Sequence, residues 1–307
     1  PAAYAKQEEL KAMRIAAGAL IRFGERYADE AAKQAKAESN PQRKAELEKI
    51  AEVCRNVPAH APSNFHEALQ YYWFVHLGVT TELNTWDAFC PGRLDQHPLP
   101  FYNPEQRAEA EELLQCFWVK FNNQPAPPKV GVTAAESGTY TDFAQINVGG
   151  IMADGSDGVN AVSYLLLDVI EEMRLLQPSS SIQVSCKNPD PFIKLAAKII
   201  RTGFGQPSVF NADVVVQEMV RVGKSLADAR NGGTSGCVET GAFGKEAYIL
   251  TGYFNIPKVF ELALHDGRDP RTGSQLGPHS GDPRAFTSFE QLYAAFEAQM
   301  RHFIDVK

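Results

Sequence analysis

The sequence has few cysteines and no long apolar run. Its 307 residues include five cysteines, and no two of them form a Cys-x-x-Cys pair. An odd, scattered set is typical of a reducing compartment and fits neither a disulfide framework nor a structural zinc site. The longest apolar run, residues 71–79, is far too short to span a bilayer. We therefore expect a cytoplasmic protein with no membrane partner and no bound metal; a microcompartment stays open.

Neither sign of charge dominates the sequence. The net charge is −7, and acidic and basic residues are interspersed, which argues against a nucleic-acid partner. The length allows one large domain or two small ones. The chain starts at Pro1 and ends within the helical pattern of residues 301–307. We therefore expect a piece of a longer protein.

Helices are predicted in the first part of the sequence and at three later starts. Residues 5–54 are rich in Ala, Lys and Glu with helical apolar spacing, which indicates one or two long helices. Three polar pairs predict further helix starts: Asn64 with Glu67 as a capping box, Ser225 with Asp228, and Ser288 with Gln291. His76, on the aromatic face of the helix after Asn64, is expected to be a core histidine and not a ligand.

Short strands alternate with helices in the rest of the chain. Strands are expected within residues 145–153, 181–185 and 208–210, and helices lie between them. No internal repeat is evident. The alternation alone predicts an α/β sheet or a parallel α/β barrel.

The glycine-rich segment Gly232–Gly241 holds the strongest candidate for catalysis. Alternate residues of an extended segment point to the same side, so Cys237 and Glu239 can face one cavity while Val238 points away. Flanking glycines leave room for a substrate, and a carboxylate can move a proton beside a reacting sulfur. The residues alone leave open a buried cysteine in a glycine-rich turn.

The Cys237 loop resembles the active-site loop of glycyl radical enzymes, the superfamily that includes pyruvate formate-lyase. Gly236-Cys237-Val238-Glu239 and the glycine-rich run after it carry this resemblance. Five more segments follow in the order that this family shows: residues 65–70, 91–96, 147–150, 177–179 and 207–211.

The resemblance implies a fold and a cofactor. The fold class is α/β, part of a ten-stranded barrel with helices outside and the Cys237 loop in its centre. Residues 1–307 then form one partial barrel domain, with a helical lead-in over about 1–60 and a barrel segment over 61–307. The cofactor is a protein-borne glycyl radical in a C-terminal motif that this chain lacks.

Site residues follow from the same resemblance. Cys237 is expected to become the thiyl radical that removes hydrogen from the substrate, and Glu239 to be its neighbouring base. Phe143, Trp86, Asp87 and Cys90 stand where family members place substrate-binding residues, although Phe143 also fits an ordinary core aromatic.

Two charged residues between these candidates have a structural interpretation. Arg93 and Asp95, in the second of the five segments, are expected to form an ion pair in preference to binding substrate. His265 is expected to be a charge near a helix C-terminus.

Three sequence features favour a lyase acting on a small anion. Gly236 replaces the second cysteine of pyruvate formate-lyase, which argues against acyl transfer. Thr240, where many polyol, choline and hydroxyproline enzymes have proline, and the apolar residues 86–89 argue against those substrates. We expect C–S cleavage of a 2-hydroxysulfonate first and arylacetate decarboxylation second.

Other classes and partners stay open. The resemblance implies a homodimer and a radical S-adenosylmethionine activating enzyme as partners. A truncated, non-catalytic paralogue or binding domain is the competing class. A thiolate hydrolase is a third interpretation, and it needs a base such as His265 near Cys237.

Overall fold

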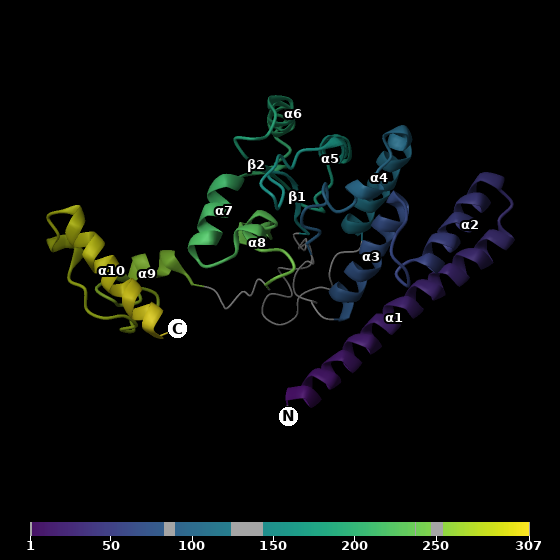
Figure 1. The fold of residues 1–307 in the computed structure, drawn as a ribbon. Coiled ribbons are helices and arrows are strands. Elements are labelled where there is room, and N and C mark those ends of the chain that lie inside the picture. Colours follow the sequence, from purple (N-terminus) through teal and green to yellow (C-terminus); the bar gives the residue numbers. More distant parts are fainter. Residues whose placement is uncertain (1, 83–89, 124–143, 237, 247–253, 307) are drawn as a thin grey trace. The chain divides into compact units, whose positions relative to one another are not determined.

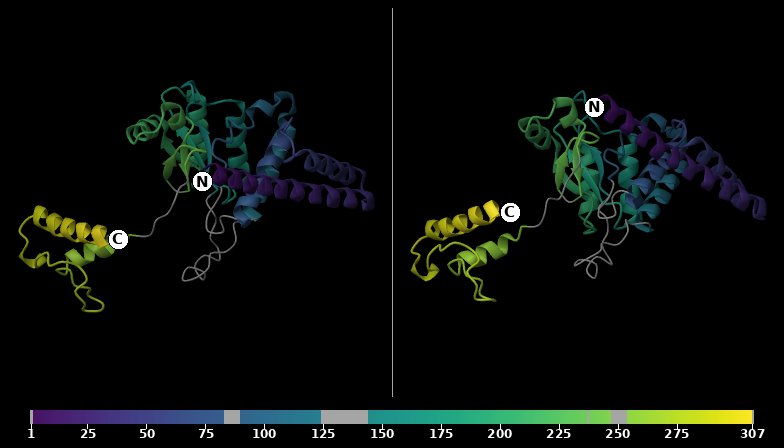
Figure 2. Two further views of the ribbon diagram at one scale, coloured as in Figure 1. Left: turned by 60° about the horizontal axis from the view of Figure 1, so that its bottom comes forward. Right: turned by 90° about the horizontal axis from the view of Figure 1, so that it is seen from below.

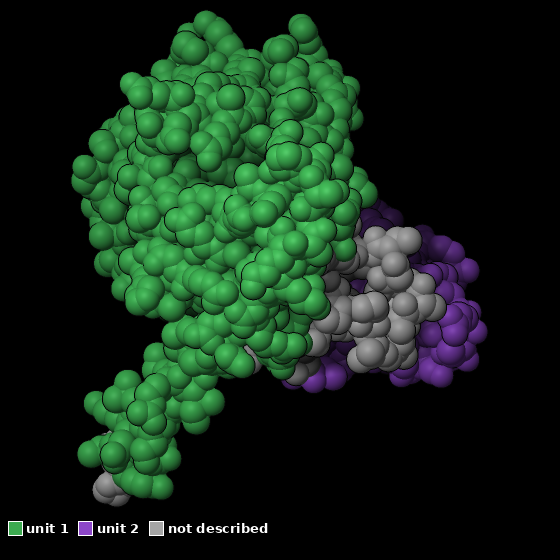
Figure 3. Space-filling view, turned by 90° about the vertical axis from the view of Figure 1, so that its right-hand side faces the viewer, with its two compact units in different colours: residues 1–248 green, residues 249–307 purple. Residues whose placement is uncertain are grey.

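The computed structural model describes residues 2–82, 90–123, 144–236, 238–246 and 254–306. The chain forms two compact units, residues 1–248 and residues 249–307, which Figure 3 shows in different colours. Among the described residues, no helix has both the length and the apolar character that crossing a membrane requires.

The first unit begins with a pair of long helices that lie side by side, α1 (Ala2–Ala37) and α2 (Pro41–Asn56) (Figures 1 and 2). The Asn40 side chain accepts hydrogen bonds from the backbone N–H groups of Gln42 and Arg43, and so starts α2. The prediction of one or two long helices over residues 5–54 is confirmed.

Two further helices, α3 (Phe65–Glu82) and α4 (Arg107–Asn123), pack together beside the sheet. Asn64 caps α3 by accepting from the Glu67 N–H at 3.0 Å, as expected. The Glu67 carboxylate accepts from the backbone and hydroxyl of Ser63, one residue earlier than a capping box requires. Short 3-10 turns at Leu99–Phe101 and Pro104–Gln106 precede α4.

A parallel three-stranded sheet follows, in the order β1 (Ile146–Gly149), β2 (Ser180–Val184) and β3 (Ser208–Asn211). Helices α5 (Ala161–Met173) and α6 (Asp190–Ile200) connect its strands. Parallel neighbours need such crossover connections. All three predicted strands are therefore confirmed.

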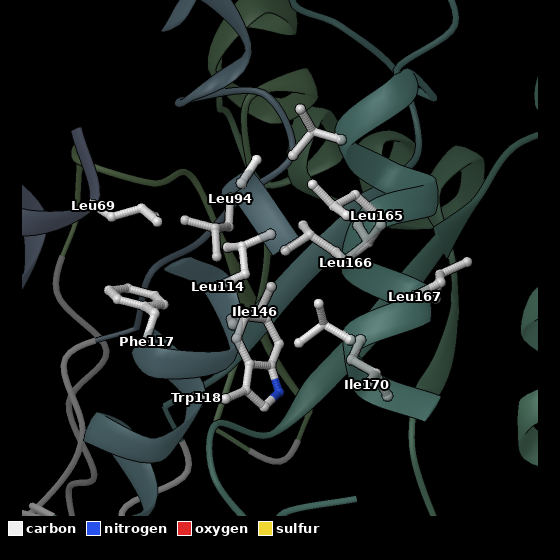
Figure 4. Close-up of a cluster of buried hydrophobic side chains, with 14 of the residues drawn as sticks. Leu69, Leu94, Leu114, Phe117, Trp118, Ile146, Leu165, Leu166, Leu167 and Ile170 are labelled. Atoms are coloured by element: carbon white, nitrogen blue, oxygen red, sulfur yellow. The ribbon is translucent and has the colours of Figure 1, made fainter. Parts of the chain in front are cut away.

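The main hydrophobic core lies between this sheet and the helices (Figure 4). Ile146 of β1 meets Leu114 and Trp118 of α4, and Leu166 and Ile170 of α5 cover it from the other side. Burying a large apolar side chain contributes about 1.5–3 kcal/mol. Because neighbouring residues of a strand face opposite ways, fixing Ile146 in this core directs Asn147 to the other face of the sheet.

The first unit ends with two short helices and a hairpin. Helices α7 (Ala212–Arg221) and α8 (Leu226–Arg230) precede the antiparallel strands β4 (Gly233–Ser235) and β5 (Glu239–Gly241). The Ser225 hydroxyl accepts from the Asp228 N–H at 3.1 Å, which confirms the predicted helix start.

The second unit contains helices α9 (Ile256–Ala263) and α10 (Phe289–Val306), with a 3-10 turn at Pro283–Ala285. Gln291 does mark the start of α10, but its Oε1 accepts from the N–H of Thr287, not from Ser288. His265 follows α9 in this unit, where its N–H donates to the carbonyl of Leu262.

Candidate active site

The segment that carries Cys237 forms a β-hairpin. Strands β4 and β5 pair in the register Gly233 with Gly241, Thr234 with Thr240 and Ser235 with Glu239. Cys237 itself lies outside the described residues. Gly236, just before it, has φ +54°, a left-handed conformation that glycine adopts without strain. The glycine therefore provides the turn that returns the chain to Glu239.

The Glu239 carboxylate lies at the tip of this hairpin. Its Oε2 accepts from the backbone N–H of Val238 at 2.9 Å. A Cβ atom placed on Gly236 would come within 2.8 Å of the same oxygen. The carboxylate thus lies against both sequence neighbours of Cys237. Val238 is 69% exposed, so its side chain lies largely in solvent.

Cys90 approaches the hairpin from a distant part of the sequence. Its Sγ lies 3.3 Å from the hydroxyl of Ser235, the residue that pairs with Glu239. The backbone N–H of Gln145 donates to the same sulfur at 3.4 Å. The structure thus brings one predicted substrate-binding residue beside the hairpin. The other three, Trp86, Asp87 and Phe143, lie outside the described residues, and their roles stay predictions.

The base of the hairpin is attached to the parallel sheet by buried polar side chains. The Asn147 carboxamide bonds both backbone groups of Thr234: Oδ1 accepts from its N–H at 2.9 Å, and Nδ2 donates to its carbonyl at 2.7 Å. Gln183 donates to Asn147 Oδ1 at 2.7 Å, and the hydroxyls of Ser181 and Thr234 lie 3.1 Å apart. All four residues are buried.

Arg93 and Asp95 hold the site's framework, but not as the predicted ion pair. In the described part of the chain, no nitrogen of Arg93 lies within 4.0 Å of the Asp95 carboxylate. Arg93 instead donates from Nε to the Gly232 carbonyl and from Nη1 to the Gly149 carbonyl, each at 3.0 Å. Asp95 Oδ2 accepts from the Gly149 N–H at 2.7 Å and from the Ser163 hydroxyl at 2.6 Å. The predicted ion pair is therefore not a direct contact: backbone groups and the Ser163 hydroxyl are the closer partners, although the opposite charges of Arg93 and Asp95 still act on each other's pKa.

Burial also changes the protonation of Asp95. The residue has no exposed surface, and this burial raises the pKa of its carboxyl to about 6. The hydrogen bonds from Ser163 and Gly149 and the positive charge of Arg93 act in the opposite direction.

The position of His76 can also be compared with its sequence expectation. His76 is buried and lies against the rings of Trp73 and Phe121, as expected for a core histidine. Over the described ranges, no three His, Cys, Asp or Glu side chains gather closely enough to hold a metal ion.

Sequence reasoning missed the roles of Asn147 and Thr234. A signal was present, because Asn147 interrupts the apolar residues Ile146 and Val148 within a predicted strand. A buried amide in that setting needs hydrogen-bond partners. The sequence does not show that those partners belong to the cysteine hairpin.

Comparisons with known proteins match the whole chain. The model of the family described as pyruvate formate lyase-like matches residues 1–307. The trans-4-hydroxy-L-proline dehydratase of Clostridioides difficile is 57% identical over 99% of this chain and 39% of its own length. Its crystal structure with that substrate bound has a TM-score of 0.92, at 56% identity, over 99% of this chain and 39% of that chain.

Two more distant relatives also resemble this chain, one compared by sequence and one by structure. The isethionate sulfite-lyase of Oleidesulfovibrio alaskensis is 32% identical over 97% of this chain and 37% of its own length. The glycerol-bound, B12-independent glycerol dehydratase of Clostridium butyricum has a TM-score of 0.84, at 33% identity, over 94% of this chain and 36% of that chain. The chain thus spans less than half the length of each relative.

The hairpin and the parallel sheet therefore have counterparts in solved structures of the enzyme superfamily that the Cys237 loop resembles. The expected fold class, part of an α/β barrel of the glycyl radical enzyme type, is confirmed by these likenesses. The chain belongs to the pyruvate formate lyase-like family of glycyl radical enzymes.

Proposed function

We propose that the full-length protein is a glycyl radical dehydratase that removes water from a cyclic hydroxy amino acid of the trans-4-hydroxy-L-proline type. The observation that carries this proposal is the 57% identity to the hydroxyproline dehydratase, against 32% to the isethionate sulfite-lyase. The proposal changes the ranking of candidate substrates expected from the sequence, which placed a 2-hydroxysulfonate first.

The position of Thr240 removes one argument for the earlier order. Thr240 is exposed and follows Glu239 directly in β5. Side chains of successive strand residues point to opposite faces, so that of Thr240 lies on the face opposite to Glu239. The residue at this position is therefore a weak guide to the substrate.

The hairpin supplies two groups suited to this reaction. The glycyl radical, outside this chain, would supply the unpaired electron that makes Cys237 able to abstract hydrogen. Cys237 would take a hydrogen atom from the ring carbon that lies between the nitrogen and the hydroxyl-bearing carbon. Glu239, whose carboxylate accepts from the Val238 N–H at the hairpin tip, would move protons beside it.

The steps balance as the loss of one water. The hydroxyl leaves as water with a proton from Glu239, and the ring nitrogen then gives its proton to the resulting carboxylate. The hydrogen atom returns from Cys237 to the carbon that lost the hydroxyl. A cyclic imine remains, and no net oxidant or reductant is consumed. Glu239 therefore acts first as an acid and then as a base.

Partners and cofactor are part of the same proposal. The full-length protein would carry its radical on a glycine outside this chain, receive it from a radical S-adenosylmethionine activating enzyme, and work as a homodimer in the cytoplasm.

The test is a competition between substrates. Activated full-length enzyme, kept free of oxygen, is offered trans-4-hydroxy-L-proline, isethionate and phenylacetate in parallel. Mass spectrometry should detect the dehydrated cyclic imine from the first substrate. Sulfite from isethionate, without dehydration of hydroxyproline, would restore the sulfonate assignment; carbon dioxide and toluene from phenylacetate would favour a decarboxylase.

A further inference from the structure

Asn147 pairs with β4 as a neighbouring strand would. It projects from β1 toward the hairpin, and its carboxamide accepts from the N–H and donates to the carbonyl of the same residue, Thr234. A backbone strand offers the same combination of one acceptor and one donor. The side chain therefore takes the place of backbone pairing at the base of the hairpin.

The chemistry of this contact selects an amide. The Thr234 N–H can only donate and its carbonyl can only accept, so the orientation of the Asn147 oxygen and nitrogen is fixed by their partners. A carboxylate of the same shape has no donor for the carbonyl. An apolar side chain leaves both backbone groups of Thr234 without this partner in a buried place.

A second layer of hydrogen bonds holds the carboxamide itself. Gln183 of β2 donates from Nε2 to Asn147 Oδ1 at 2.7 Å and to the Thr234 hydroxyl at 3.2 Å. Asn147 pairs with Ser181 in the sheet register, and Ser181 and Gln183 lie two residues apart on the same strand face. The polar face of the sheet thus meets the hairpin through several linked bonds.

The close approach of the Asn147 side chain to β4 also depends on a glycine, Gly233. A Cβ atom on Gly233 would lie 2.6 Å from Asn147 Oδ1, which no side chain tolerates without a shift. The next residues along β4 are Thr234 and Ser235, and Ser235 pairs directly with Glu239. The carboxamide therefore fixes the hairpin only one residue away from the pair that holds the proposed acid.

We propose that Asn147 is a positioning residue that sets the hairpin carrying Cys237 and Glu239 against the parallel sheet. The proposal rests on the proposed function of that hairpin. Among the described residues, the Asn147 carboxamide bonds Thr234 and Gln183, and it acts through Thr234 on the geometry of the tip. Its loss should lower the rate of the chemical step more than substrate affinity.

The experiment compares two near-isosteric variants of the full-length protein, Asn147→Asp and the control Asn188→Asp. Asn188 is also a buried carboxamide, and its Nδ2 also donates to a backbone carbonyl, that of Gly150, at 2.7 Å. Each substitution replaces the Nδ2 donor of the asparagine by a carboxylate oxygen, which accepts. The other side-chain hydrogen bonds of Asn188 go to Ser185 and Asp157, which lie outside the hairpin.

Two readouts separate positioning from general loss of stability. Hydrogen exchange, followed on peptides covering residues 232–241 without activation, should be about tenfold faster in Asn147→Asp and unchanged in the control, because one buried hydrogen bond is lost. After activation to equal glycyl radical signal, kcat should fall about tenfold or more with KM within a few-fold, while the control keeps its kcat.

Each outcome decides the proposal. Unchanged exchange in the hairpin, or faster exchange with an unchanged kcat, overturns the positioning role. An equal fall of kcat in both variants also overturns it. If the unmodified enzyme turns over none of the substrates offered, the proposed function fails, and the exchange result alone decides whether Asn147 holds the hairpin.

Discussion

Arg93 and Asp95 bind the two backbone groups of one residue, Gly149, from opposite directions. Arg93 Nη1 donates to its carbonyl, and Asp95 Oδ2 accepts from its N–H. Arg93 also reaches the Gly232 carbonyl at the entrance to the hairpin. The two charged residues therefore connect the end of β1, the start of α5 through Ser163, and the base of the hairpin that carries Cys237.

This relationship predicts that Arg93→Lys destabilises the protein. A lysine ammonium is a single compact group and cannot reach both carbonyls as the guanidinium fork does. The loss of one buried, charged hydrogen bond should cost on the order of 2 kcal/mol of unfolding free energy. Urea unfolding of the full-length protein measures it.

The matched control for this change is Arg107→Lys. Arg107 pairs with Asp168 at 2.7 Å on the surface, where exposed ion pairs contribute below about 1 kcal/mol. Equal losses in the two variants would mean that the two carbonyl contacts of Arg93 add nothing.

The raised pKa of Asp95 predicts that the free energy of unfolding depends on pH. Its pKa is raised to about 6 from 3.8. Between these values the folded chain holds a proton that the unfolded chain has released. The stability from this group is therefore fully present below roughly pH 4 and lost as the pH rises through 6.

The comparison with Asp95→Asn isolates this effect from other titrating groups. The unfolding free energy of the unmodified protein relative to the variant should fall between pH 4.5 and 7 by on the order of 2 kcal/mol. Urea midpoints at several pH values give the difference. A difference that stays constant, or grows with pH, would show that Asp95 does not titrate in this window.

Cys237→Ser should abolish turnover in the full-length enzyme without loss of the glycyl radical signal. An alcohol O–H bond is too strong to relay hydrogen, whereas activation occurs at the distant glycine. Electron paramagnetic resonance measures the radical, and an anoxic assay measures turnover. Turnover retained by the serine variant would sink the assignment of Cys237 as the hydrogen-transferring residue.

Glu239→Gln should lower turnover by roughly 10²–10⁴, the usual contribution of general acid–base catalysis. The fold should persist, because the amide oxygen can still accept from the Val238 N–H. Peptide-resolved hydrogen exchange checks the hairpin, and initial rates check catalysis. Activity within a few-fold of the unmodified enzyme would make Glu239 a structural residue of the hairpin.

The sequence by itself determined the local elements and the family. The long helices before residue 57, the caps at Asn64 and Ser225, and the three parallel strands depend on residues close together in the chain. Capping and periodicity are local, so they can be predicted without knowing the fold. The order of short motifs, together with the Cys237 loop, was enough to indicate glycyl radical enzymes.

The tertiary structure alone decided how the site is held together. Asn147 meets a partner 87 residues away, Arg93 one 139 residues away and Cys90 one 145 residues away. The sequence paired Arg93 with Asp95 because they are neighbours, yet folding gives each a backbone partner in place of the other. A buried polar group takes whichever partner the packing brings within reach, and at such separations only the folded chain determines which one that is.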